Sequence, residues 1–83
     1  MRRWGRQPMD QQHLLNSLGK RVRDLRVKRG WSQEDLADKS DLHSTYIGGI
    51  ERGVRNPSYL SLAKLAKALN VALPELLRIG VLR

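Results

Sequence analysis

The amino-acid sequence predicts a small all-α protein of five helices. Apolar residues recur three and four positions apart in successive windows of the chain, which is the period of an amphipathic helix. Residues that favour helix ends separate these windows, and no window alternates between apolar and polar residues as a half-buried strand would. The 83 residues suffice for one domain, whose core is too small for high stability unless a second copy of the chain adds to it.

The first helix is expected to start at Leu14 and to be one of the two longer ones. Its apolar residues lie at helical spacing, with basic residues mostly between them. Gly30 is expected to cap its C-terminal end, where Lys28 and Arg29 suit the negative pole of the helix. Residues 1–12 are interpreted as a flexible basic arm that leads into no apolar signal core, and residues 13–83 as the folded domain.

Two short helices are expected next, at residues 32–40 and 44–51. Ser32 can cap the first of them, because Asp35 stands at the capping-box spacing, and Asp41 tolerates the left-handed backbone of a tight turn. Ala37 is small enough to lie where the two helices meet. Two short helices joined by a turn of three or four residues form the helix-turn-helix pattern.

The fourth and fifth helices follow a loop. Gly53 ends the third helix, Ser58 can cap the fourth, and Asn70 ends it. Pro74 fits the first turn of a short fifth helix.

The net charge of +8, with a pI near 10.9, favours a polyanionic partner. Nucleic acid is the first such partner and an anionic membrane surface the second, whereas the alternative is that the charge serves solubility alone. The charge is unevenly distributed, because residues 31–51 contain one basic residue and five acidic ones between two basic flanks. A nucleic-acid interpretation requires these acidic side chains to be paired or turned away from the phosphates.

Several kinds of function are not expected. The chain has no cysteine and no apolar run long enough to span a membrane. Its two histidines, His13 and His43, have no second ligand at metal-binding spacing. No arrangement of nucleophile, base or phosphate-binding loop indicates catalysis, so no enzyme activity, metal, cofactor or small-molecule ligand is predicted.

The central motifs resemble a known family. The strings are GWSQEDLA at residues 30–37, YIGGIERG at residues 46–53, NPS at residues 56–58 and LAKLAKALNV at residues 62–71. They are similar to the lambda-repressor-like helix-turn-helix proteins of the xenobiotic-response-element (XRE) family, and in pattern most similar to the controller proteins of restriction–modification systems. The resemblance covers residues 17–78. It implies a cytoplasmic, bacterial or phage-type regulator of transcription that binds double-stranded DNA as a homodimer on an inverted repeat.

The resemblance and the docking of helix-turn-helix motifs also indicate site residues. Base contacts are expected from the exposed start of the third helix and its glycine face, namely His43, Ser44, Thr45 and Gly49. Phosphate contacts are expected from the second helix, from the first turn of the third and from the loop that follows it, namely Gln33, Tyr46, Arg52, Arg55 and Asn56. Tyr46 can equally fill the core. Glu51 is expected to pair with Arg26 as a structural link between helices.

Two further features leave alternatives open. Gly48 and Gly49 together cost a helix about 2 kcal/mol relative to alanine, which indicates either a close approach to DNA or a neighbouring helix, or tolerance at exposed positions. Basic residues of the arm, Arg2, Arg3 and Arg6, either enter a minor groove or belong to an unstructured tail.

The sequence departs from the family pattern in the turn between the second and third helices and at the start of the third helix. Asp41 stands where the family usually has glycine, and residues 43–45 lack the arginine that controller proteins often place there. The operator of a relative therefore cannot be assigned to this chain.

The C-terminal segment is expected to form the dimer contact. It carries more apolar residues than one short helix can bury in so small a core, namely Leu73, Leu76, Leu77, Ile79 and Val81. The main alternative is an antitoxin or adaptor, in which this surface would bind a different protein. Non-specific binding of RNA or membrane is a third interpretation, which the few aromatic residues disfavour.

Overall fold

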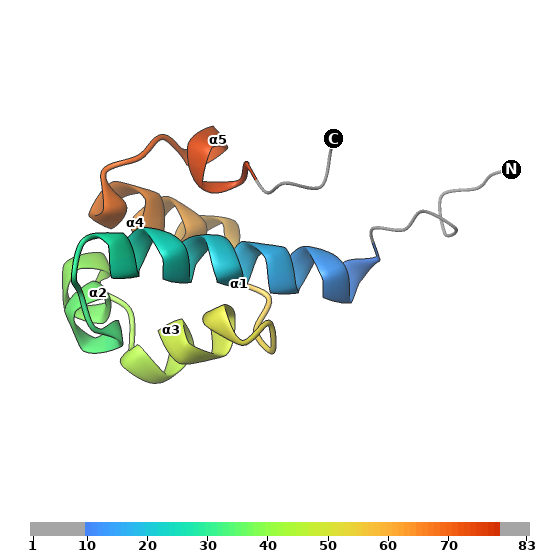
Figure 1. Ribbon diagram of the computed structural model, residues 1–83, viewed down its shortest axis with the longest axis horizontal. Coiled ribbons are helices and arrows are strands. Elements are labelled where there is room, and N and C mark those ends of the chain that lie inside the picture. The colour runs from blue at the N-terminus through green and yellow to red at the C-terminus, as the bar shows by residue number, and fades with distance from the viewer. Residues whose placement is uncertain (1–9, 79–83) are drawn as a thin grey trace, which may run out of the picture.

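The computed structural model describes residues 10–78, which form five α-helices and, within that range, no strand. The helices are α1 (Gln11–Lys28), α2 (Gln33–Ser40), α3 (Ser44–Glu51), α4 (Tyr59–Leu69) and α5 (Leu73–Leu76). The long helix α1 runs through the middle of the molecule, with α3 on one side of it and α5 on the other (Figure 1). The predicted all-α class and the order of the helices are confirmed.

Helix α1 begins earlier than the apolar pattern predicts. Asp10 is its N-cap, and its carboxylate accepts a hydrogen bond of 2.8 Å from the backbone N–H of His13. Asp10 as the cap and Gln11 and Gln12 as helical residues therefore belong to the folded part, and their assignment to the arm is wrong. The cap and the first residues of this helix are polar, so the spacing of apolar residues in the sequence did not indicate them. The arm residues Arg2, Arg3 and Arg6 lie outside the described part of the chain.

The predicted helix ends are present. Ser32 and Asp35 form a capping box, in which Asp35 N–H donates to Ser32 Oγ at 3.0 Å and Ser32 N–H donates to Asp35 Oδ2 at 2.8 Å. Asp41 takes the left-handed conformation, with φ 60° and ψ 41°, and Asn70 does the same after α4. The capping box fixes where α2 begins, and the two left-handed residues fix where α2 and α4 stop.

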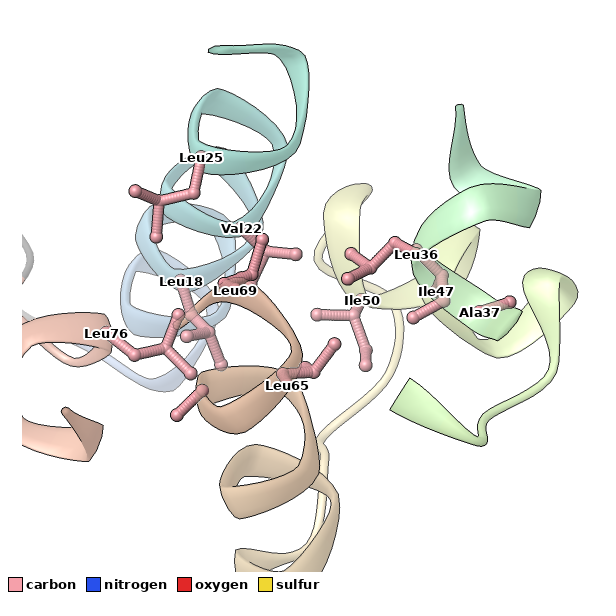
Figure 2. Packing of buried hydrophobic residues seen from close by; sticks show 11 residues of the cluster. Leu18, Val22, Leu25, Leu36, Ala37, Ile47, Ile50, Leu65, Leu69 and Leu76 are labelled. Atoms are coloured by element: carbon pink, nitrogen blue, oxygen red, sulfur yellow. The ribbon is translucent and has the colours of Figure 1, made fainter. Parts of the chain in front are cut away.

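The core draws on all five helices. Figure 2 shows its apolar side chains meeting between α1, α4 and the α2–α3 pair, and its members are Leu18, Val22, Leu25, Leu36, Ala37, Ile47, Ile50, Leu65, Ala66, Leu69 and Leu76. Helices α1 and α3 approach closely, because a Cβ at Gly19 would collide with the backbone of Ile50 and Glu51. Packing against α1 and α4 thus holds the α2–α3 pair in a fixed orientation.

The last residue of α5, Leu76, and its C-cap residue, Leu77, differ in burial. Leu76 is completely buried, so it does not lie on an exposed dimer surface and that part of the prediction is corrected. Leu77 is 42% exposed and Leu73 is half-buried against the core. The two other residues expected at the dimer contact, Ile79 and Val81, lie outside the described residues.

An arginine of α1 attaches α5 to the rest of the fold. Arg21 Nη2 donates to the backbone carbonyl of Glu75 and to its Oε2, each at 3.0 Å. None of the helices in residues 10–78 is long and apolar enough to cross a membrane.

Candidate nucleic-acid interface

Helices α2 and α3 are joined by a tight, hydrogen-bonded turn. Leu42 N–H donates to the carbonyl of Ala37 at 3.0 Å, and the buried hydroxyl of Ser40 donates to the same carbonyl at 3.3 Å. Ala37 is buried at the contact of the two helices, as its small size predicts. The turn therefore fixes the angle at which the start of α3 leaves the body of the protein.

The start of α3 presents polar side chains to solvent. His43 is the N-cap, makes no capping hydrogen bond and is exposed, as is Thr45, whereas Ser44 is half-buried. Tyr46 is half-buried and packs against the core. His43, Ser44 and Thr45 are thus brought together at one accessible helix end, as expected for residues that read base edges.

The outer stripe of α3 continues from Thr45 through Gly48 and Gly49 to Arg52, since these positions are three and four apart. Both glycines are buried, although they lie on this stripe. Side chains from the same chain cover them, and Arg55 covers Gly49. Arg55 therefore occupies the surface above Gly49, where a base contact was expected.

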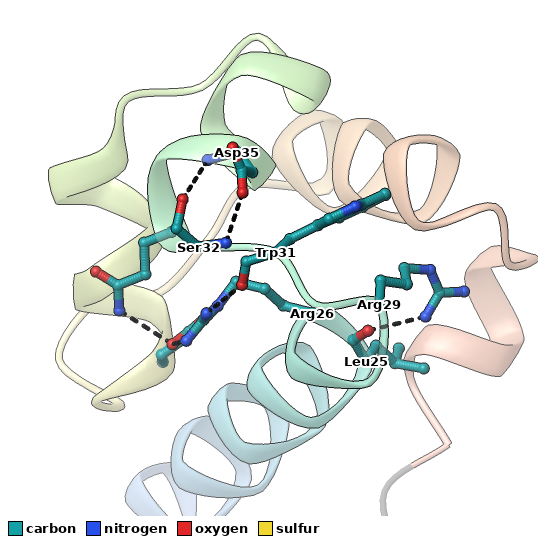
Figure 3. A network of polar contacts seen from close by, with 8 residues as sticks. Leu25, Arg26, Arg29, Trp31, Ser32 and Asp35 are labelled. Carbon is teal, nitrogen blue, oxygen red and sulfur yellow. Dashed lines mark hydrogen bonds and ion pairs between the residues drawn. The ribbon is translucent and has the colours of Figure 1, made fainter.

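Glu51, the one acid of α3, is tied into a network with two other helices. Its Oε2 lies 2.7 Å from Arg26 Nε, and its Oε1 accepts hydrogen bonds from Arg26 Nη2 at 2.9 Å and from Gln33 Nε2 at 3.0 Å. Arg26 also donates to the carbonyl of Trp31 at 2.7 Å (Figure 3). The Glu51 side chain is 4% exposed, and its hydrogen bond raises the pKa of Arg26. This acid consequently offers no charge to the surface.

Gln33 has a role that the sequence did not reveal. It was expected to contact a phosphate, but it is half-buried and one of its amide N–H donors is used by Glu51. The second N–H and the carbonyl oxygen remain for other partners. Gln33 therefore links the start of α2 to the end of α3.

The other acids of the central region divide into two groups. Asp35 is held in the capping box, where the backbone N–H of Ser32 lowers the pKa of its carboxyl. Glu34, Asp38 and Asp41 stay exposed and line an open groove that His43 and Ser44 also border. The start of α3 is thus flanked by exposed acids on the α2 side, although a nucleic-acid interpretation requires these acids to be paired or turned away from the phosphates.

Cations and amides lie beyond the other end of α3. Arg52, Arg55 and Asn56 are exposed and follow the helix directly. Gln12 of α1 reaches the same region and donates to the carbonyl of Gly53 at 2.9 Å. No sequence signal marks Gln12, because an exposed glutamine in a polar first turn looks like any surface residue. Within residues 10–78, no group of histidines and acids is arranged to hold a metal ion.

Known proteins share this fold and sequence. The Helix-turn-helix family profile matches residues 22–76. Control protein C.SmaI of Serratia marcescens is 50% identical over 60 residues, which cover 72% of this chain and 71% of that protein. The restriction-modification controller protein C.AhdI from Aeromonas hydrophila superposes with a TM-score of 0.73 and 48% identity, covering 75% of this chain and 94% of that one.

A further solved relative was crystallised with DNA. It is the restriction-modification controller protein C.Esp1396I, whose tetramer was solved in complex with its natural 35 base-pair operator. It superposes with a TM-score of 0.70 and 42% identity, covering 77% of this chain and 88% of that one. The fold of the aligned part of this chain is therefore shared with experimentally solved controller proteins.

Proposed function

Because the chain belongs to the helix-turn-helix family, and within it to the restriction-modification controller proteins, we propose that it is a sequence-specific DNA-binding regulator of transcription. It acts as a homodimer on an inverted-repeat operator, without enzymatic activity and in the cytoplasm. The solved complex of C.Esp1396I with its operator supports duplex DNA as the partner class. The identity of 50% with control protein C.SmaI supports the regulatory role.

The observation that carries the proposal is that the negative charge of the one acidic residue of α3, Glu51, is neutralised by its partners. Arg26 and Gln33 bind the carboxylate of Glu51, while Arg52 and Arg55 stay exposed beside the same helix. The surface of α3 is therefore polar at its start and basic at its end, which suits a helix lying in the major groove between two phosphate strands.

Roles follow from side-chain chemistry. Ser44 and Thr45 can donate to and accept from base edges, the Thr45 methyl can contact a thymine methyl, and His43 can donate or accept beside them. Phosphates are bound by the backbone N–H groups at the start of α2 and by five side-chain donors. Of these donors, Arg52, Arg55 and Asn56 are exposed, whereas Gln33 and Tyr46 are half-buried. We propose a minor-groove contact for the arm residues Arg2, Arg3 and Arg6.

Dimerisation supplies the second half-site. The exposed Leu77 and the half-buried Leu73 of α5 are proposed to contact the same residues of a second copy. Two α3 helices about 34 Å apart would then enter successive major grooves on one side of the duplex. Arg21 fixes α5 to α1, so the dimer contact and the reading helices form one rigid unit.

Selection of bound sites from random duplexes tests the proposal. Sequencing of the bound pool is expected to return an inverted repeat whose half-sites are about 10 base pairs apart, centre to centre. Affinity for the selected site should exceed that for random duplex by about a thousandfold, and log Kobs should fall with log salt by about 0.9 per phosphate contacted. A pool without a shared motif, or binding that ignores salt, would contradict it.

A further inference from the structure

Two adjacent glycines lie in the middle of the helix proposed to read DNA. Gly48 and Gly49 occupy the interior of the eight-residue helix α3, where glycine is a poor choice for helix stability. Neither has positive φ, so no backbone strain demands glycine there. Each is instead buried beneath side chains that arrive from outside the helix.

Gly49 makes room for Arg55. A Cβ at position 49 would collide with Cγ of Arg55 and would lie 3.4 Å from its Nε and 3.5 Å from its Cβ. The stem of Arg55 therefore crosses α3 directly above Gly49. The backbone brings it there, because Val54 N–H donates to the carbonyl of Gly49 at 2.9 Å and turns the chain back over the helix.

Gly48 makes room for two other polar side chains. A Cβ at position 48 would lie 3.1 Å from Arg52 Nη1 and 3.3 Å from Gln33 Oε1. Gln33 is fixed from its other side, since its Nε2 donates to Glu51 at 3.0 Å. The amide of Gln33 and the guanidinium of Arg52 thus both lie over a helix surface that has no side chain of its own.

We propose that Gly48 and Gly49 are positioning residues, whose missing side chains form two slots on α3 that hold Arg55, and Arg52 with Gln33, in the orientation that binds phosphates. The inference rests on the proposed function, because the three held side chains matter only if α3 docks on DNA. Slots that hold long side chains before binding reduce the rotamer freedom lost on binding. The glycines therefore affect affinity without touching the DNA themselves.

Gly49→Ala is the principal test, in the full-length protein on its selected duplex. The methyl group displaces the Arg55 stem, so affinity should fall about tenfold, the loss expected for one charge-assisted hydrogen bond. The slope of log Kobs against log salt should become shallower by about 0.9, because one phosphate contact is lost. Alanine favours helix more than glycine does, so circular dichroism should show a thermal midpoint no lower than that of the parent.

Gly48→Ala provides a graded comparison. The clearance at Gly48 is larger, since Arg52 Nη1 and Gln33 Oε1 need to shift by only a few tenths of an ångström. Its effect on affinity should consequently be smaller than that of Gly49→Ala. The reverse order would overturn the assignment of Arg55 to the tighter slot.

Arg55→Ala serves as the matched background. Without Arg55 the added methyl group has nothing to displace, so Gly49→Ala/Arg55→Ala should bind as Arg55→Ala does. If Gly49→Ala lowers the affinity for DNA equally in the parent and in Arg55→Ala, the methyl group meets the DNA itself. That result would overturn the proposed slot for Arg55. Binding by Gly49→Ala equal to that of the parent would also overturn it.

A measurement without DNA separates this inference from the proposed function. Contacts between Gly49 Hα and the Arg55 methylenes should appear in nuclear Overhauser spectra of the free parent protein and vanish in Gly49→Ala. Their absence from the parent overturns the slot even if DNA binding is strong. Failure of the parent to prefer any duplex sequence overturns the proposed function, whether or not the contacts are seen.

Discussion

Arg26 and Glu51 form a two-pronged ion pair between α1 and the end of α3, with side chains that are only 11% and 4% exposed. Gln33 of α2 binds the same carboxylate, so three helices converge on one acid. The pair adds a polar contact to the apolar packing of α3, whose buried hydrophobic residues are Ile47 and Ile50. Its loss is expected to affect stability more than any surface ion pair.

Removing Glu51 should strongly destabilise the protein. Glu51→Ala leaves the Arg26 guanidinium nearly buried with no counter-charge, which typically costs about 3–5 kcal/mol. Urea unfolding at neutral pH measures the change. Lys20→Ala is the control, because the Lys20–Asp24 pair is 77% and 59% exposed and should contribute less than about 1 kcal/mol. Equal effects of the two substitutions would contradict the structural role of the network.

Asp35 should make the stability of α2 depend on pH in the acid range. The N–H of Ser32 lowers the pKa of this carboxyl from its ordinary value of 3.8, so folding is favoured when the group is ionised. The contribution is present at pH values above 3.8 and is lost as the pH falls through the lowered pKa of the folded state.

Thermal unfolding of the parent and of Asp35→Asn between pH 7 and pH 2 would check this. The parent should be the more stable at neutral pH, since asparagine lacks the charge that strengthens the capping hydrogen bond. The difference should shrink towards the acid end of the range. A difference in thermal midpoint between the two proteins that stays constant with pH would refute the role given to the ionised Asp35 carboxylate.

Arg21 should influence dimerisation without lying on the proposed dimer surface. It holds α5 through the carbonyl and the carboxylate of Glu75, so Arg21→Ala is expected to loosen α5 and to raise the dimer dissociation constant about tenfold, the loss of one charge-assisted hydrogen bond. Sedimentation equilibrium measures the constant. Arg78→Ala is the matched control, because Arg78 contacts Glu75 at 3.6 Å and is 70% exposed.

The proposed contact itself is tested by Leu77→Glu, which places a charge on the exposed leucine of α5 and should give monomers at concentrations where the parent is dimeric. A parent that sediments as a monomer, with Leu77→Glu causing no change, would exclude α5 as the dimer contact.

Local features of the chain were predictable from the sequence. The capping box of Ser32, the left-handed turn at Asp41 and the stop at Asn70 depend on residues within a few positions, and all are present. The cap at Asp10 was missed, because an acid before a polar turn gives no periodic signal. Leu76 and Leu77 are neighbours of equal hydrophobicity, so only the packing of α5 could tell which one is buried.

The positions that polar side chains take in the folded protein could for the most part not be predicted from the sequence. The Arg26–Glu51 pair was indicated by resemblance to the family, but the hydrogen bond from Gln33 depends on the angle between α2 and α3. The position of Arg55 over Gly49 depends on how the loop turns back after α3. The one sequence signal for this position of Arg55 was the pair of glycines in the third helix, whose cost to helix stability called for a compensating contact.

Thr45 and Arg52 should separate base reading from phosphate binding, since they lie on the same outer stripe of α3 at its two ends. Thr45→Ala removes a hydroxyl and a methyl group from the reading end, so it should lower the preference for the selected base at one half-site position by about 1–3 kcal/mol while leaving the salt slope unchanged. Arg52→Ala should weaken binding to all sequences alike and reduce the salt slope by about 0.9. Fluorescence anisotropy on duplexes with single base changes, titrated at several salt concentrations, measures both quantities. If instead Arg52→Ala lowered the base preference and Thr45→Ala reduced the salt slope, α3 would lie in the groove with its other end towards the bases.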